Sequence, residues 1–132
     1  MGKVGIDMHL PFARAIKDKR GTAAIEFAIV GPIFLSLCVG MIYVCMLLFS
    51  VGSLQYAVEE GARCASVKTT VCTSNSATQT YAAGVYYGPL ITPTFTATSP
   101  ACGHQVSGSA TFSLNTGLRT ISVPLTAVAC FP

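Results

Sequence analysis

The chain has 132 residues, of which 52% are hydrophobic and only 10% are charged. Its mean hydropathy of +0.60 is too high for an ordinary soluble domain, in which about a quarter of the residues are charged. Five of the eight Lys and Arg residues lie within residues 1–20, so the net charge of +3 belongs to the start of the chain and does not indicate a nucleic-acid partner.

Residues 1–21 form a basic leader that stands directly before an apolar run. Lys and Arg residues that flank a membrane span stay on the cytoplasmic side, so we expect this leader in the cytoplasm. The chain beyond about residue 50 is then predicted to lie across the membrane.

Residues 22–66 are predicted to form one continuous helix, membrane-spanning to about residue 50. Residues 27–51 carry no charged side chain, and this run is longer than the roughly 20 residues that a membrane span needs. The apolar core of a cleaved signal peptide has about 7–15 residues, so the length favours a retained anchor. The alternative is a signal-peptidase cut after Ala57, which would release a secreted protein.

The upper part of this helix is predicted to be amphipathic, because apolar residues recur at three- and four-residue spacing. These residues are Val51, Leu54, Val58, Ala62 and Ala65. At 1.5 Å per residue, about 45 helical residues extend roughly 65–70 Å, about twice the thickness of a membrane, so this part protrudes. We also expect an ion pair between Glu59 and Arg63, one helical turn apart.

Beyond residue 67 the chain becomes rich in Ser, Thr, Gly and Pro, and three stretches alternate apolar and polar residues. This alternation is typical of antiparallel strands with one buried face. The apolar positions are Ile91, Phe95 and Ala97 in the first stretch, Val106, Ala110, Phe112 and Leu114 in the second, and Ile121, Val123, Leu125, Ala127 and Ala129 in the third. We expect this face to pack against the protruding part of the helix.

Local signals refine the β domain, which is predicted over residues 67–132. Residues 115–117 predict a three-residue turn with Gly117 at positive φ. Pro124 predicts that the third strand lies at the sheet edge or carries a bulge. A short helix is expected around residues 77–83.

Four of the six cysteines lie in the predicted exported part: Cys64, Cys72, Cys102 and Cys130. Four cysteines in a small exported domain predict a disulfide framework with three possible connectivities. We predict the pairs Cys64–Cys72 and Cys102–Cys130, because each pair joins segments that we expect to be neighbours. A zinc site is the alternative, but the spacings match no compact zinc-ligand pattern.

The other two cysteines, Cys38 and Cys45, lie in the apolar run, seven residues apart and therefore on one face of the helix. We interpret them as small apolar packing residues. A crosslink between subunits or a cofactor site is the alternative.

The sequence does not predict an enzyme. Acid–base or nucleophilic catalysis needs a base held by an orienting group, but the sequence after Gly21 has no aspartate and a single histidine, His104. The sequence also lacks glycine-rich phosphate loops and metal-ligand clusters. We therefore predict no catalytic residues, no cofactor and no metal site.

Glu26 is the single charged residue between Thr22 and Val58. An ionised carboxylate at the edge of a membrane is costly unless it is paired, so Glu26 is a candidate functional group. A cut after Gly21 would create a nearby partner, the new α-amine of Thr22. The alternative is that Glu26 lies among lipid headgroups and is solvated.

Two segments carry a family resemblance, residues 20–32 (RGTAAIEFAIVGP) and residues 60–63 (EGAR). Together they resemble the TadE-like family, whose members are minor pilins or pseudopilins of the bacterial tight-adherence (Flp, type IVc) pilus. The resemblance implies that a prepilin peptidase cuts after Gly21 and leaves Thr22 first. Glu26 then matches the family's acid and Phe27 the aromatic that follows it, and Pro32 ends the motif; these three are the expected assembly residues.

The resemblance implies a pilin-like α+β fold, a long N-terminal transmembrane helix that protrudes into a small antiparallel β-sheet domain. It also implies a minor pilin that assembles, initiates or tips a pilus. The expected partners are other pilins, the pilus assembly machinery, the prepilin peptidase and inner-membrane lipid, with no nucleic acid. The expected location is the bacterial inner membrane, in a single pass with a cytoplasmic N-terminus. The alternative function is a membrane-anchored adhesion or binding domain that never joins a filament.

Overall fold

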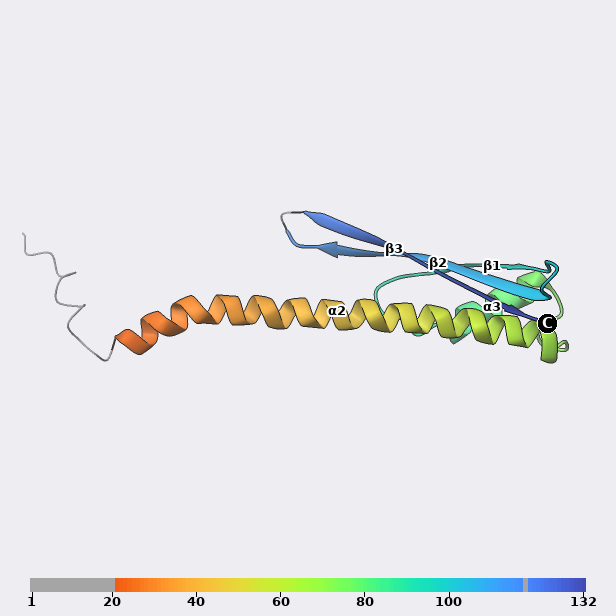
Figure 1. Cartoon of the computed structure of the whole chain (residues 1–132), viewed down its shortest axis with the longest axis horizontal. Coiled ribbons are helices and arrows are strands. Elements are labelled where there is room, and N and C mark those ends of the chain that lie inside the picture. The colour runs from red at the N-terminus through yellow and green to blue at the C-terminus, as the bar shows by residue number, and fades with distance from the viewer. Residues whose placement is uncertain (1–20, 118) are drawn as a thin grey trace, which may run out of the picture. The chain divides into compact units, whose positions relative to one another are not determined.

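A computed structural model describes residues 21–117 and 119–132, so the predicted leader lies outside the described residues except for Gly21. The elements are α2 (Thr22–Val67), α3 (Asn75–Val85), β1 (Thr94–Thr98), β2 (His104–Asn115) and β3 (Thr120–Phe131). Figure 1 shows the strands lying alongside the second half of α2. The predicted α+β class, a long apolar helix followed by a small antiparallel sheet, is confirmed.

α2 begins directly after Gly21, whose carbonyl accepts the first helical hydrogen bond from the N–H of Ile25 at 3.2 Å. The helix then continues through Pro32, which has no N–H to donate and disturbs the turn before it. Figure 1 shows the helix bending within its first, orange-coloured turns. Its end at Val67 lies one residue beyond the predicted end.

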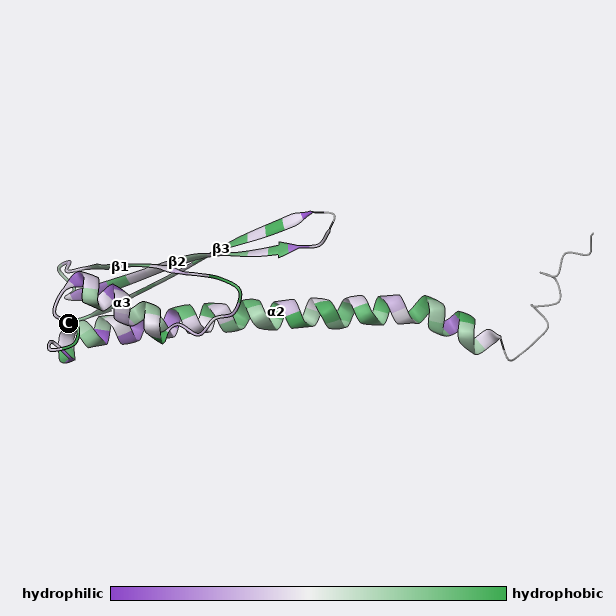
Figure 2. Ribbon diagram, turned by 180° about the vertical axis from the view of Figure 1, so that it is seen from behind, coloured by the Kyte–Doolittle hydropathy of each residue, from purple (hydrophilic) through white to green (hydrophobic). Residues whose placement is uncertain are grey.

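The chain divides into two compact units, residues 1–41 and 42–132. In the described part of the first unit, α2 exposes large apolar side chains on all sides, whereas in the second unit one face of α2 is buried. Figure 2 shows this change as a mostly hydrophobic first half of α2 and purple, hydrophilic bands in its last turns. The β domain predicted over residues 67–132 therefore omits the second half of α2, which belongs to the same compact unit, residues 42–132.

The sheet is antiparallel with the order β1-β2-β3. Most of the buried positions are those that the alternation predicts, with Phe95 and Ala97 in β1, Val106 and Phe112 in β2, and Leu125 and Ala127 in β3. Ile121, predicted on the same face, is exposed because it lies at the end of the hairpin beyond the core. Ile91 is half-buried but lies outside β1. β3 is an edge strand, as its proline predicts.

The core lies between the sheet and the upper half of α2. Leu54, Val58 and Ala62 are buried as predicted, but Val51 is exposed and the neighbouring Ser50 is buried in its place. The helical face that meets the sheet therefore passes through Ser50. Its hydroxyl donates to the carbonyl of Met46 at 2.9 Å, which offsets the cost of burying a polar group.

Two glycines allow the elements of this core to approach closely. A Cβ on Gly108 of β2 would lie 2.9 Å from Leu54 Cδ1 and 3.1 Å from Val58 Cγ1. A Cβ on Gly61 of α2 would lie 3.1 Å from the Cβ of Ala82 in α3. The absence of side chains at these positions sets the spacing between α2 and its two neighbours.

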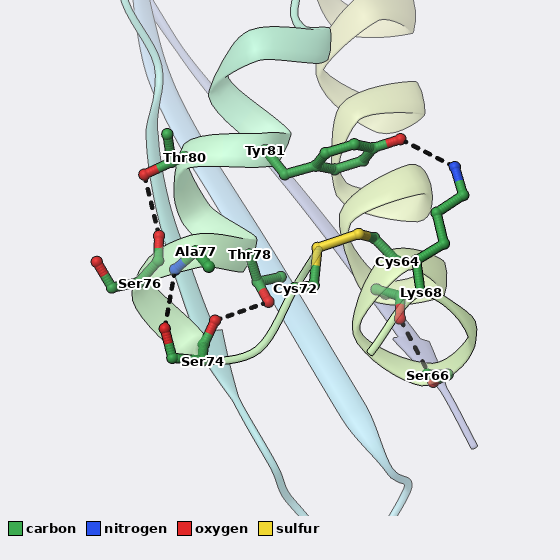
Figure 3. Close-up of a disulfide and its surroundings, with 11 residues drawn as sticks. Cys64, Ser66, Lys68, Cys72, Ser74, Ser76, Ala77, Thr78, Thr80 and Tyr81 are labelled. Atoms are coloured by element: carbon green, nitrogen blue, oxygen red, sulfur yellow. Dashed lines mark hydrogen bonds between the residues drawn. A yellow bond between two sulfur atoms is a disulfide. The ribbon is translucent and has the colours of Figure 1, made fainter. Parts of the chain in front are cut away.

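Two disulfides join the pairs that the sequence analysis selected, Cys64 with Cys72 and Cys102 with Cys130. The first connects the last turns of α2 to the segment before α3, as Figure 3 shows. In the same view, Ser74 caps α3 by accepting a hydrogen bond from the N–H of Ala77 at 3.2 Å. The short helix predicted around residues 77–83 is therefore present and longer than expected.

The turn between β2 and β3 differs in detail from the prediction. β2 includes Asn115, so the connection comprises residues 116–119 instead of 115–117. Gly117 adopts the predicted positive φ, at 79°, and its N–H donates to Asn115 Oδ1 at 2.9 Å. The side-chain hydrogen bond of Asn115 extends the turn's influence into the strand, which explains why the residue looks like part of the turn in the sequence.

The structure argues against the secreted alternative. Ala57 is fully buried at the centre of the core, and Ser50 and Leu54 precede it on the same helical face. A signal-peptidase cut after Ala57 would remove these side chains and leave the apolar face of the sheet without its partner.

We expect Gly61→Val to destabilise the compact unit by about 1–3 kcal/mol, because the added side chain would overpack the contact with Ala82. Gly52→Val is the matched control, since a Cβ at Gly52 meets no atom within 4 Å and both glycines lie in α2. The measurement is the thermal unfolding midpoint of the full chain in detergent. Equal midpoints for the two variants would contradict the close packing at Gly61.

We expect replacement of the Cys102–Cys130 pair by serines to lower the free energy of unfolding by about 3.5 kcal/mol, because the unfolded chain gains entropy. The same replacement of the Cys64–Cys72 pair should lower it by about 2.5 kcal/mol. The reason is loop length, because the two bonds close loops with sequence separations of 28 and 8. Denaturant unfolding of the two double variants and the parent chain measures this order. A larger loss for the shorter loop would show that the unfolded-chain argument does not hold here.

Candidate processing and assembly site

The predicted processing residues stand at the start of α2. Gly21 is the turn residue immediately before α2, and Thr22 is the first helical residue. Glu26 follows Thr22 by four residues, so both side chains lie on one face of the helix, one turn apart. Because long helical side chains generally lean toward the helix N-terminus, we expect the Glu26 carboxylate to lean toward Thr22.

Phe27 and Pro32 shape the apolar surface beside this acid. Phe27 is 76% exposed, and its ring lies over Gly31, where a Cβ would be 3.7 Å from the ring. The sequence analysis did not single out Gly31, whose place one turn after an aromatic residue is the only signal for this contact. Together with the bend that accompanies Pro32, the exposed ring gives this part of α2 a distinct apolar contact surface.

Among residues 21–117 and 119–132, one ion pair is present, and it lies far along the chain from Glu26. It joins Glu60 and Arg63 at 3.9 Å near the surface, where such pairs contribute little to stability. The predicted Glu59–Arg63 pair is wrong: Glu59 instead accepts a hydrogen bond from Gln55 at 2.8 Å. The i,i+3 spacing brings Glu60 to Arg63, and Gln55 occupies the carboxylate of Glu59.

Residues 21–117 and 119–132 contain no group of three His, Cys, Asp or Glu side chains that could hold a metal ion. The predictions of no catalytic residue and no cofactor remain predictions. Cys38 is half-buried and Cys45 exposed on α2, and neither forms a disulfide within the described chain.

α2 is long and apolar enough to cross a membrane, and only 6% of its most apolar 18-residue window is buried. A core helix of a soluble domain would be mostly buried, so the exposure favours a lipid-facing segment. This criterion rests on length and composition and is compatible with a single-pass anchor.

The compact unit limits how far lipid can extend along α2. Tyr43, Met46 and Leu47 pack against the core beneath the sheet. The sheet carries exposed hydroxyl side chains and open strand edges. A strand edge cannot lie in hydrocarbon, because its backbone N–H and C=O groups would have no hydrogen-bond partners there. If α2 crosses a membrane, we expect the span to end near Met41, which leaves Thr22 to Met41, about 20 residues or 30 Å of helix.

The two free cysteines test this boundary. A membrane-impermeant maleimide should label Cys45 in spheroplasts and leave Cys38 unlabelled, because the reactive thiolate forms only in contact with water. Cys38→Ala and Cys45→Ala variants report each thiol separately, and detergent-solubilised protein gives the full labelling. Absence of label at Cys45 in spheroplasts, with full labelling in detergent, would place the boundary beyond residue 45, as the predicted end near residue 50 requires.

The family model described as TadE-like protein matches residues 21–63. The match begins at the glycine that precedes α2 and ends one residue before the first disulfide-bonded cysteine, so it leaves α3 and the sheet unmatched. No curated protein and no solved structure matches the chain. Over residues 21–63, about a third of its length, the chain is therefore similar to the TadE-like family.

Proposed function

We propose that this protein is a minor pilin of the tight-adherence pilus. A prepilin peptidase cuts between Gly21 and Thr22, and the mature chain remains anchored in the inner membrane by α2 until it enters a filament. Its compact unit lies on the outer side of the membrane. The protein acts by assembly and attachment and performs no chemistry of its own.

The observation that carries this proposal is the coincidence of three boundaries at one residue. Gly21 is where the family match begins, it directly precedes α2, and there the basic leader gives way to the apolar run. A retained anchor without processing has no need for a glycine at this junction. A prepilin requires one, according to the family resemblance.

Glu26 supplies the physical reason for processing before assembly. In a bundle of apolar helices, a buried carboxylate is tolerated only when a partner charge and hydrogen bonds compensate its lost hydration. The cut creates a positive α-amine on Thr22 at the same end of the helix. Pairing with the Glu26 of a neighbouring subunit would fix the axial register of the two helices as well as neutralise the acid.

The outer surface of the sheet suits contact with other subunits or with a surface. Its solvent-facing side chains are mainly hydroxyls, with Thr96 and Ser107 hydrogen-bonded across neighbouring strands at 2.6 Å. Hydroxyl groups are cheaper to desolvate than charged groups, so this face can be covered by a partner at low cost.

Mass spectrometry and filament counting test the proposal together. The mature protein isolated from membranes should begin at Thr22. Glu26→Gln should reduce surface pili at least about tenfold, since loss of a buried charge's partner costs several kcal/mol, while the amount of processed protein in the membrane stays normal. The matched control is Glu59→Gln, which changes an exposed acid on the same helix and should leave pili unaffected.

Each result has a contrary outcome. A first residue other than Thr22 excludes processing at Gly21. Normal piliation in Glu26→Gln cells shows that the carboxylate is not needed for assembly and favours a solvated acid at the headgroups.

The second candidate is a membrane-anchored adhesion domain that never joins a filament. It is favoured by the hydroxyl-rich sheet, which lies outside the segment matched by the family. This candidate predicts an intact leader and no change in piliation when the gene is deleted.

A further inference from the structure

The second half of β2 has an open backbone edge. β1 pairs with β2 only as far as Ser109, whereas β3 pairs with β2 as far as Asn115. Figure 1 shows the β2–β3 hairpin extending beyond β1. No segment of the described chain pairs with β2 beyond Ser109 on that side, so residues 111–115 end the sheet there.

The hydrogen-bond pattern of the hairpin shows which groups point to this edge. Residues of an antiparallel pair alternate between hydrogen-bonded and non-hydrogen-bonded positions. The N–H of Thr116 donates to the carbonyl of Arg119, so Thr116 and Arg119 form a hydrogen-bonded pair. This pair follows directly on the pair of Asn115 and Thr120. Because the two kinds of pair alternate, the even-numbered residues of β2 form their backbone hydrogen bonds with β3. The residues that direct their N–H and C=O groups to the open edge are Thr111, Ser113 and Asn115.

A proline interrupts the opposite edge of the sheet. Pro124 of β3 stands opposite Thr111, so its nitrogen faces outward and has no N–H to offer. Natural sheets protect their edges with prolines and charged residues. Residues 110–115 of β2 contain neither, so the edge of β2 lacks the protection that β3 has.

A groove of about 470 Å³ adjoins the open edge where β1 and β2 part. It is lined by Leu90 and Ile91 before β1 and by segments of both hairpin strands, and none of its lining residues carries a charge. Leu90 has φ of 66°, a costly conformation for a residue other than glycine, and its side chain is 74% exposed. Half of the ten lining residues are Ser or Thr and half are apolar, so the groove offers hydroxyl and apolar contacts next to unpaired backbone groups.

We propose that the open edge of β2 and this groove accept an extended, uncharged segment of a partner protein as an added strand. Backbone hydrogen bonds to β2 supply the affinity, and the groove takes an uncharged side chain of the segment. The absence of charge among the lining residues disfavours a charged occupant, whose desolvation would go uncompensated.

A second copy of this chain fits the edge less well. The β3 strand of a second copy is a poor partner for this edge, because Pro124 removes one of its outward backbone N–H groups. The β2 strand lies along α2, so antiparallel pairing of two β2 strands requires the α2 helices of the two copies to point in opposite directions. Copies anchored in one membrane have α2 helices that point in the same direction. The proposal does not depend on incorporation into a pilus.

Hydrogen exchange on the full chain in detergent tests the site. The probe is a capped peptide of about seven alternating threonine and valine residues, the length of a typical strand. At saturating peptide, the amides of Thr111, Ser113 and Asn115 should exchange roughly tenfold more slowly, as expected for newly bonded edge amides. The same peptide with N-methylated alternate amides should give no protection.

Ser113→Pro should abolish binding, because it removes an outward N–H and leaves the bonds to β3 intact. Ser122→Pro is the matched control, since Ser122 stands opposite Ser113 and faces the outer edge of β3. Equal binding by both variants, or no protection of the parent chain by the probe, overturns the proposal. If the parent chain is a dimer and its β2 edge amides are protected from exchange without peptide, the occupant of the edge is a second copy and the proposal is overturned. If Ser113→Pro fails to fold, the N-methylated peptide decides on the unaltered protein.

Discussion

The burial of the sheet's apolar face against α2 is the contact on which the compact unit depends. A three-stranded sheet of this size is marginal alone, and an isolated helix in water gains little from its own hydrogen bonds. Each supplies the surface that the other lacks, with Leu54 and Val58 on the helix facing Val106 and Phe112 on the sheet. Gly108 brings the two layers close, and the disulfides hold the segments at the ends of α2 and of β3.

The same contact divides one continuous helix between two solvents. Before residue 42 the side chains of α2 are mostly exposed and mostly apolar, which is compatible with a lipid environment, and Glu26 is the one charged side chain among them. From Tyr43 onward one face lies beneath the sheet, and the hydroxyls of the strands must remain in water. If α2 crosses a membrane, the polar groups of the sheet are expected to limit the span on its outer side, although the apolar run in the sequence continues for several more residues.

Charge is almost absent from this arrangement, which gives each exception significance. Glu26 is the single acid in the lipid-facing part of α2. Its place one turn after Thr22 links the proposed cut to assembly, because the cut supplies the opposite charge. The outer unit also lacks charges along the open edge of β2, where backbone groups replace ion pairs as the means of recognising a partner.

The sequence by itself determined the elements and most of their faces. Period-two alternation identified the buried side of each strand, the long uncharged run identified α2, and the order of cysteines along neighbouring segments led to the pairs that the structure contains. The candidate processing and assembly residues, which stay predictions, also came from the sequence, because Glu26 interrupts an otherwise uncharged helix and Gly21 precedes it. These features depend on local periodicity and on isolated charges, which a linear pattern preserves.

Only the tertiary structure decided which face of α2 meets the sheet. Within a uniformly apolar run, Val51 and Ser50 cannot be ranked by pattern, and the contact with the strands buried the serine because its hydroxyl bonds within the helix. The start of the compact unit at Ile42, the close approach at Gly61 and Gly108, and the early end of β1 pairing likewise depend on distances between segments remote in the chain. No local periodicity encodes such distances, because they arise only when the layers pack.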